Sequence, residues 1–180
     1  MAVDFKKMLS GGDLRSIGKV NLIVSEIQNQ KDFDALFNCL YSDDRLIVMR
    51  AADAIEKITF KRVDFLCGHK EEILAFCERA GDIEFKWHLA LLLPRLPFSE
   101  SEYDNVREIL SSWLLDPKES KIVRANSLQA LYELSKRDVT TKEKFDSVLS
   151  VLEKENVPSL LTRIRKIKTL DIKPTSSRII

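Results

Sequence analysis

The sequence predicts an all-α fold, a solenoid of about five stacked helical hairpins, and three observations predict it. Residues that cap helices recur at a nearly constant interval, apolar residues recur in register behind them, and glycine and proline are few. The chain has 180 residues, of which 5 are glycine and 5 are proline, too few for the many tight turns of a β-sandwich or barrel. With 44% hydrophobic and 32% charged residues, the composition suits amphipathic helices with wide polar faces.

Short polar residues that favour a helix N-terminus stand immediately before apolar helical runs. They are separated by 31, 38, 38 and 36 positions: Asp13, Asp44, Asp82, Ser120 and Asn156. Each of these side chains can accept a hydrogen bond from the unpaired N–H groups in the first turn of a helix. We therefore predict that each one begins the second helix of a hairpin.

Apolar residues follow the predicted caps at fixed offsets. Eight, 11 and 14 positions after Asp44 stand Ala52, Ile55 and Ile58. The equivalent positions of the other hairpins are Asn21, Val24 and Ile27; Ala90, Leu93 and Leu96; Leu128, Leu131 and Leu134; and Ile164, Ile167 and Leu170. Positions three apart lie on one helix face, so each second helix is expected to bury one apolar stripe.

A first amphipathic helix is expected before each cap, at 31–41, 70–79, 103–115 and 142–153, with a shorter one near Val3–Leu9. Turn-rich or charged joints separate the helices. The repeats then cover about 1–30, 31–61, 62–98, 99–138 and 139–171, which form a single domain over 1–171, and 172–180 is predicted to be a flexible C-terminal tail.

Pro94 lies inside the second helix of the third hairpin. Proline has no N–H to bond to the carbonyl of Ala90, so we expect this helix to kink or to end early.

The repeat resembles the HEAT-repeat family. The likeness is clearest in the segment Ile122–Leu131, where the pair Val123-Arg124 opens a second helix, and it is kept less faithfully at Phe85-Lys86 and Val48. The resemblance covers about residues 10–170. It implies a right-handed α–α superhelix whose second helices line the concave surface. It implies no single activity, because one architecture serves many functions.

The net charge and the hydropathy of the chain limit the classes of function that it can have. A formal net charge of +1 gives the chain as a whole no strong attraction for nucleic acid or membranes. No apolar stretch reaches about 18 residues, so no membrane span is expected. The N-terminal segment Met1–Lys7 lacks the apolar core of a signal peptide. The 3 cysteines have no CxxC spacing, and a reducing, cytoplasmic location is expected.

No catalytic, cofactor or metal motif stands out. Cys39 and Cys77 occupy a repeat position otherwise filled by leucine, which predicts two buried thiols. Cys67 is the expected exposed thiol, and a metal site that joins it to His69 lacks the paired ligand spacing of zinc sites. Without a phosphate-binding loop or a visible nucleophile and base, we expect a protein that is not an enzyme and has no cofactor or metal.

The polar face of the second helices is the candidate site. The predicted partner-binding groove consists of Lys19, Arg50, Asp53, Trp87, His88, Arg95, Asn126, Gln129, Tyr132 and Arg165. A line of polar and aromatic groups is typical of a surface that binds a protein or peptide. An ordinary solvated helix face, with Trp87 packed against a neighbouring repeat, explains the same residues equally well.

The last helix is strongly basic. It carries Arg163, Arg165, Lys166 and Lys168 with no acid before Asp171. Such a helix binds an anionic partner or gives a terminal repeat a polar outer face, and we favour the second interpretation.

The leading hypothesis is a non-enzymatic scaffold or adaptor that binds a protein or peptide of unknown identity. The alternative is a HEAT-like DNA-binding protein or alkylpurine DNA glycosylase, for which Arg50, Asp53 and Trp87 are of the right types. The near-neutral charge and the mixed signs in the groove make nucleic acid the less favoured partner. A HEAT-like lyase acting on tetrapyrrole–protein conjugates has no identifying residues here.

Overall fold

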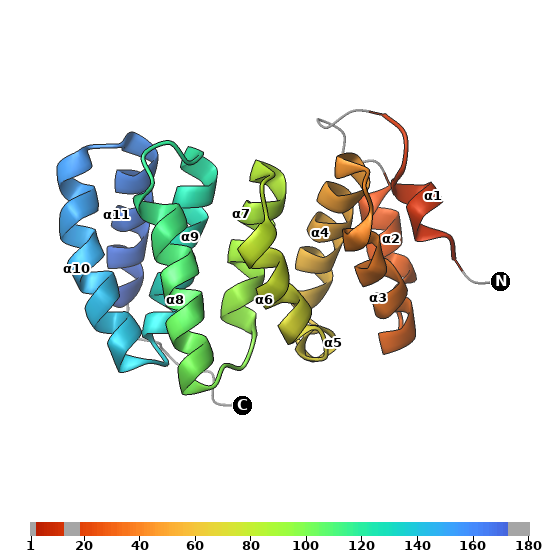
Figure 1. Cartoon of the computed structure of the whole chain (residues 1–180), viewed down its shortest axis with the longest axis horizontal. Helices are drawn as coiled ribbons and strands as arrows, with labels where there is room; N and C mark the ends of the chain where they lie inside the picture. The colour runs from red at the N-terminus through yellow and green to blue at the C-terminus, as the bar shows by residue number, and fades with distance from the viewer. Residues whose placement is uncertain (1–2, 13–18, 173–180) are drawn as a thin grey trace. The chain divides into compact units, whose positions relative to one another are not determined.

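The computed structural model describes residues 3–12 and 19–172, with side chains as far as residue 170. Within these residues it contains helices and no strand, which confirms the all-α prediction (Figure 1). In chain order the elements are α1 (Phe5–Leu9), α2 (Val20–Glu26), α3 (Gln30–Phe37), the 3-10 segment η1 (Asn38–Tyr41), α4 (Arg45–Thr59), α5 (Asp64–Cys67), α6 (Lys70–Arg79), α7 (Ile83–Leu92), the 3-10 segment η2 (Leu93–Arg95), α8 (Glu100–Leu115), α9 (Lys121–Ser135), α10 (Val139–Glu155) and α11 (Pro158–Ile172).

The chain divides into two compact units, Met1–Pro97 (unit 1) and Phe98–Ile180 (unit 2). Unit 1 contains α1 to α7, and unit 2 contains α8 to α11. This division does not test the single domain predicted over 1–171, which stays a prediction. The tail predicted at 172–180 lies, apart from the backbone of its first residue, outside the described residues.

Three of the predicted caps precede second helices. The Asp44 carboxylate accepts a hydrogen bond from the N–H two residues on, at 2.9 Å, and begins α4. The Ser120 hydroxyl accepts one from the N–H three residues on, at 3.3 Å, and begins α9. Asp82 precedes α7 without a side-chain cap, and Asp13 lies outside the described residues.

The prediction that Asn156 begins the last helix is wrong. Asn156 ends α10 in the left-handed conformation, with φ of 54°, and α11 begins two residues later at Pro158. Asparagine tolerates this conformation better than most residues, and proline suits the first turn of a helix because no N–H is needed there. In the turn between α10 and α11, Asn156 therefore ends the first helix and Pro158 begins the second.

The predicted apolar stripes are buried in the middle hairpins: Ala52, Ile55, Ile58, Ala90, Leu93, Leu96, Leu128, Leu131 and Leu134. The two end hairpins differ. In α2 the buried residues are Val20 and Ile23, whereas Asn21 is exposed, and in α11 Leu170 is 54% exposed. In α2 the buried residues therefore lie one position before those predicted by counting from Asp13. A shift of one residue rotates the buried face of a helix by about 100°.

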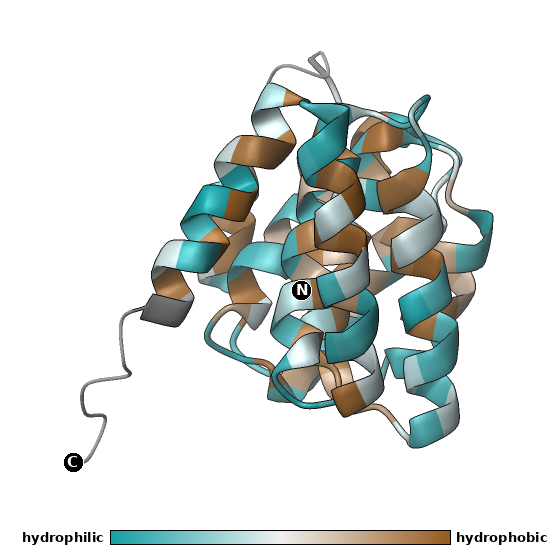
Figure 2. Ribbon diagram, turned by 90° about the vertical axis from the view of Figure 1, so that its left-hand side faces the viewer, coloured by the Kyte–Doolittle hydropathy of each residue, from teal (hydrophilic) through white to brown (hydrophobic). Residues whose placement is uncertain are grey.

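Each unit is organised around a second helix. In unit 2, α9 packs against α8, α10 and α11, and in unit 1, α4 packs against α1, α2, α3 and α7. Figure 2 shows apolar and polar residues alternating along the helices. The early end expected at Pro94 is confirmed, because α7 stops at Leu92 and Pro94 lies in η2.

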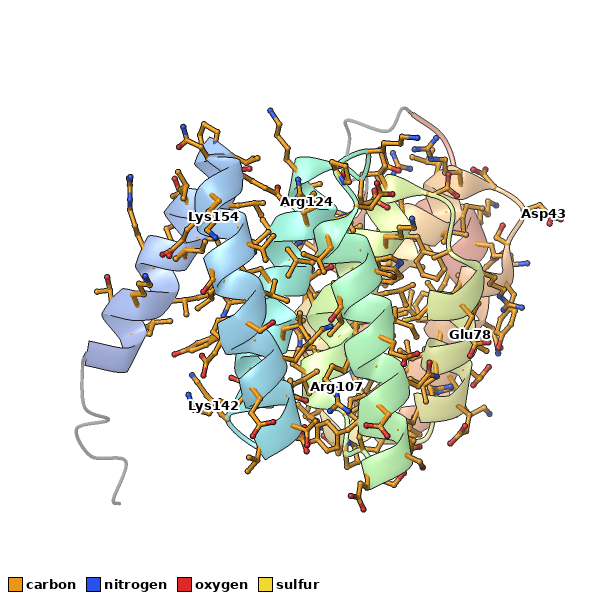
Figure 3. The ribbon with its side chains drawn as sticks, turned by 60° about the vertical axis from the view of Figure 1, so that its left-hand side comes forward. Asp43, Glu78, Arg107, Arg124, Lys142 and Lys154 are labelled. Carbon is orange, nitrogen blue, oxygen red and sulfur yellow. The ribbon has the colours of Figure 1, made fainter. Side chains whose placement is uncertain are left out.

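Hydrogen bonds from side chains tie neighbouring hairpins together within each unit. Their partners lie 31 to 41 positions apart, about the length of one repeat. In unit 2, for example, Arg124 at the start of α9 donates to the carbonyl of Leu114 in α8 and to Glu155 in α10 (Figure 3). Each hairpin is thus fixed by its nearest neighbours, as in other repeat proteins.

None of the described helices combines the length and the apolar composition that crossing a membrane requires.

Candidate functional site

Arg50 faces inward. Its side chain is 1% exposed, and its guanidinium donates to the carbonyl oxygens of Leu9 and Gly11, both at 2.6 Å. The prediction that Arg50 lies on an exposed face is wrong. Its charge is used to bind the backbone that follows α1, where carbonyl groups at the end of a short helix need donors.

His88 is also buried, at 4% exposed, so its predicted place on the polar face is wrong. Its Nδ1 lies 2.9 Å from Oε2 of Glu56, one hairpin earlier. Arg95 donates to the carbonyl of Glu56 at 2.5 Å and to Oγ1 of Thr59 at 2.7 Å. The hydrogen bond with His88 lowers the pKa of Glu56, and it outweighs the opposing effect of burial. These groups form an ion-pair network that joins α7 and η2 to α4.

Asp53, Glu56 and His88 together offer ligand atoms within 4.8 Å of one another. Two carboxylates and an imidazole are a donor set that suits zinc and related cations. However, Asp53 already pairs with Lys57 at 2.8 Å, and Glu56 has Arg95 within 3.8 Å. A cation would have to replace both pairings, so the geometry favours a structural network.

The other groove residues predicted in unit 1 are more open. Lys19 is exposed and precedes α2. Trp87 is half-buried, and its indole Nε1 is buried without a hydrogen-bond partner among the described residues. The Trp87 ring lies against the buried His88 ring, with 4.8 Å between the ring centroids, so it packs beside the network around Glu56.

The thiols have the predicted exposure, with Cys39 and Cys77 buried and Cys67 exposed. Burial raises the pKa of Cys39 to about 11 and raises that of Cys77 further, so neither is a reactive thiolate at neutral pH. His69 contacts two carboxylates and not Cys67: Nδ1 lies 2.7 Å from Glu72 and Nε2 lies 2.8 Å from Asp34.

In unit 2, Tyr132 is 3% exposed and packs against Phe145 of α10, so the prediction that it lies on an exposed face is wrong. Asn126 and Gln129 are brought together by a residue outside the predicted groove. Arg163 of α11 donates to Oδ1 of Asn126 at 3.3 Å and to Oε1 of Gln129 at 3.4 Å. Arg165, the predicted member, is exposed and contacts neither.

A pocket of about 500 Å³ lies between α9 and α11 in unit 2, and we call it the α9/α11 pocket. Its lining residues are Lys121, Ile122, Ala125, Pro158, Ser159, Thr162, Arg163 and Lys166. Those from α11 stand at 158, 159, 162, 163 and 166, and their intervals of three and four positions place them on one helix face. Arg165 is about 200° around the helix from Arg163, which explains why it does not contribute.

The lining of this pocket is positively charged. Lys121, Arg163 and Lys166 contribute three cations, and none of the lining residues is acidic. Arg163 is half-buried, and burial lowers its pKa, an effect only partly offset by the negative charge of Glu133. Glu133 itself accepts a hydrogen bond from Gln129 at 3.0 Å. Because arginine stays protonated in proteins, the pocket contains a charge that, within the described part of the chain, donates to two neutral amide oxygens and to no carboxylate.

The pocket in unit 1 has a different character. It has a volume of about 340 Å³ and is lined largely by η1, α6 and the start of α7, with Tyr41, Phe76 and Phe85 in its walls. Its charged lining residues are Arg79 and Asp82, one of each sign. Arg79 lies over the ring of Phe76, with 4.7 Å between the guanidinium carbon and the ring centroid.

Sequence reasoning missed Lys121 and did not assign Arg163 or Lys166 to the groove. The available signal was the acid-free set of basic residues in the last helix, but its groove residue was taken at the position equivalent to Gln129 counted from Asn156, and α11 begins one residue later than that cap implies. For the polar residues of α11, the acid-free run of cations was therefore the better guide than a fixed offset from the predicted cap.

Comparison with known proteins identifies the repeat. A family model described as the HEAT repeat domain matches residues 5–170. No curated protein and no solved structure matches the chain significantly. The matched segment spans both units, from the first residue of α1 to the last turn of α11. The chain therefore belongs to the HEAT repeat family.

Proposed function

We propose that this protein is a non-enzymatic interaction module that binds an acidic segment of a partner protein in the α9/α11 pocket. HEAT repeats commonly act as scaffolds for protein interactions. The observation that carries the proposal is the set of three cations, Lys121, Arg163 and Lys166, around a pocket with no acidic lining residue. Charge complementarity of this kind steers a partner to its site and selects among partners.

The apolar part of the lining supports a peptide as the ligand. Ile122, Ala125 and Pro158 form this part, and Ile122 is 40% exposed. A peptide that covers these side chains excludes water from the pocket, and the charge–charge attraction is stronger where water is excluded. Simple counterions would gain nothing from this apolar surface.

The lining favours binding and not catalysis. Ser159 and Thr162 supply hydroxyl groups, but no histidine or carboxylate lines the pocket to act as a base. The Thr162 hydroxyl donates to the carbonyl of Pro158 at 2.8 Å and is held in the helix. The glycosylase hypothesis gains no support either, because Arg50, one of its candidate groove residues, is turned inward.

A binding measurement tests the proposal. A short fluorescent peptide rich in Glu and Asp is titrated with the full chain and followed by fluorescence anisotropy. We expect the double variant Arg163→Ala with Lys166→Ala to bind about five- to thirtyfold more weakly, since each lost charge contact contributes roughly 0.5–1 kcal/mol.

A matched control removes two lysines from α10. Lys144 and Lys154 are exposed residues of α10, which contributes no lining residue, so Lys144→Ala with Lys154→Ala makes the same change in net charge outside the pocket lining. Equal losses in the two double variants would show that binding is non-specific attraction. Tighter binding of duplex DNA than of the peptide at moderate salt would favour the nucleic-acid hypothesis instead.

A further inference from the structure

We propose that the α9/α11 pocket recognises a phosphorylated side chain in the partner segment. This inference rests on the proposed function and names the group that the pocket binds. A carboxylate has one negative charge, whereas a phosphomonoester has about −1.5 to −2 at neutral pH and three acceptor oxygens. Three lining cations therefore match one phosphoryl group better than one carboxylate.

Arg163 is the residue best suited to discriminate between these groups. A guanidinium presents five donors in a planar fork and binds phosphate with two parallel hydrogen bonds. Two amide oxygens, from Asn126 and Gln129, accept from Arg163 at 3.3 and 3.4 Å, longer than most N–H···O hydrogen bonds. These contacts position the side chain beside the pocket and leave its charge without a carboxylate in ion-pair contact among the described residues.

The lysines add charge at two sides of the pocket. Lys121 is the first residue of α9 and Lys166 lies in the third turn of α11, and both are exposed. Long, flexible ammonium groups at the rim can close over an anion without a fixed geometry. Arg163 then provides the directional contact, and the lysines provide the charge.

The backbone adds a favourable field. Both α9 and α11 have 15 residues and begin at the pocket, so their positive ends lie beside it. The Ser120 side chain caps α9, but α11 is preceded by Val157, which has no side-chain acceptor. A phosphoryl oxygen could accept from the first N–H groups of α11, as anions do at other helix starts.

The volume of about 500 Å³ falls within the range of small-ligand sites, large enough for a phosphorylated side chain and its neighbours. Binding would then depend on a kinase that modifies the partner, and the unmodified partner would be held weakly.

The test compares two peptides that differ only in one phosphoryl group. Both have the same Glu/Asp-rich sequence with a central serine, phosphorylated in one of them. Titrations with the full chain are made at constant ionic strength. We expect the phosphopeptide to bind at least about tenfold more tightly, the size expected for charge-assisted hydrogen bonds. Inorganic phosphate should compete for the site more strongly than chloride of equal ionic strength.

Two substitutions locate the effect. Arg163→Lys keeps the charge and removes the fork, so it should reduce the preference for the phosphopeptide more than the affinity for the unmodified peptide. Lys121→Ala removes an exposed side chain and should weaken phosphopeptide binding without lowering the thermal midpoint. The control variant Lys144→Ala with Lys154→Ala should change neither the preference for the phosphopeptide nor the affinity for it.

The outcomes separate the two proposals. Equal affinity for both peptides, with the loss on Arg163→Ala and Lys166→Ala retained, would overturn phosphoryl recognition and leave the acidic-segment proposal standing. Binding of neither peptide would overturn both. A phosphopeptide preference that survives Arg163→Lys and Lys121→Ala unchanged would show that the site lies elsewhere.

Discussion

The two units use the cations of their second helices in different ways. In unit 1, Arg50 donates to two backbone carbonyls. Arg95 donates to a carbonyl and a hydroxyl and lies near Glu56, so both guanidinium groups are bound by other groups of the unit. In unit 2, Arg124 likewise binds a backbone carbonyl and Glu155, whereas the hydrogen bonds of Arg163 to described residues go to two amide oxygens beside a pocket. One architecture thus contains arginines held by short hydrogen bonds within the fold and a cation cluster whose arginine makes longer ones.

This difference separates structural charge from charge available to a partner. A buried cation with full hydrogen bonding is costly to remove, because its partners are left unpaired. A half-buried cation with weak partners contributes little to folding. The predictions below test this contrast by measuring how much each charge stabilises its own unit.

The largest effect is expected for Arg50→Ala. The substitution leaves the carbonyls of Leu9 and Gly11 without this donor and opens a cavity, so we expect unit 1 to lose about 3 kcal/mol of unfolding free energy. Hydrogen exchange measured by mass spectrometry should show faster exchange in α4. The matched control is Lys31→Ala, an exposed lysine in α3, which should change exchange little. Protection in α4 as high as in wild type would contradict a structural role for Arg50.

A smaller loss is expected for Glu56→Gln. The amide keeps the size of the side chain but loses the charged hydrogen bond with His88, and we expect a cost of about 1–2 kcal/mol in urea unfolding. Asp53→Asn breaks the more exposed pair with Lys57 and should cost about 0.5 kcal/mol or less. If the two substitutions cost the same, the network around His88 does not stabilise unit 1 more than a surface pair does.

The contribution of Glu56 should also depend on pH. Its pKa is lower in the folded chain than in the unfolded one, so the stabilisation is present above the unfolded pKa of about 4.3 and is lost as the pH falls through the folded pKa. The stability difference between wild type and Glu56→Gln should therefore shrink as the solution is made more acidic than about pH 4. Urea titrations over this range check it, and a difference that grows with acidity would reverse the assignment.

The smallest effect on stability is expected for Arg163→Met in unit 2, a substitution that should instead weaken binding. Methionine preserves the apolar stem of the side chain and removes a half-buried charge with weak partners, so the unfolding free energy should change by about 0.5 kcal/mol or less. The binding site predicted above would lose its main contact at the same time. A loss as large as that of Arg50→Ala would mean that Arg163 is structural, and the contrast between the units would fail.

The fold was predictable because its signal is local. Apolar residues three or four apart define a helix face, and caps such as Asp44 and Ser120 mark helix starts through hydrogen bonds to the next turn. These patterns depend on residues close in sequence, so they can be recognised without knowledge of the tertiary structure. The same logic identified Cys39 and Cys77 as buried and Pro94 as a helix end.

The candidate site was less predictable because a charged side chain does not indicate its own burial. Arg50 and His88 are buried through partners about one repeat away in the chain, at Leu9, Gly11 and Glu56. Whether Arg163 or Arg165 faces α9 depends on where α11 begins, and Asn156 looks like a cap in sequence but ends α10. Arg163 and Arg165 lie about 200° apart around the helix, so an error of one residue in the start of α11 is enough to select the wrong arginine.

The hydrogen bonds between hairpins join residues about one repeat apart in sequence, and this affects how the protein folds during its synthesis on the ribosome. No partner more than 41 positions away is needed for those bonds, so contact order is low and folding is expected to be fast. Unit 1 is complete at Pro97, while the ribosome needs on the order of ten seconds to translate unit 2. The buried charges of unit 1 can therefore find their partners before the cations of the α9/α11 pocket have left the exit tunnel.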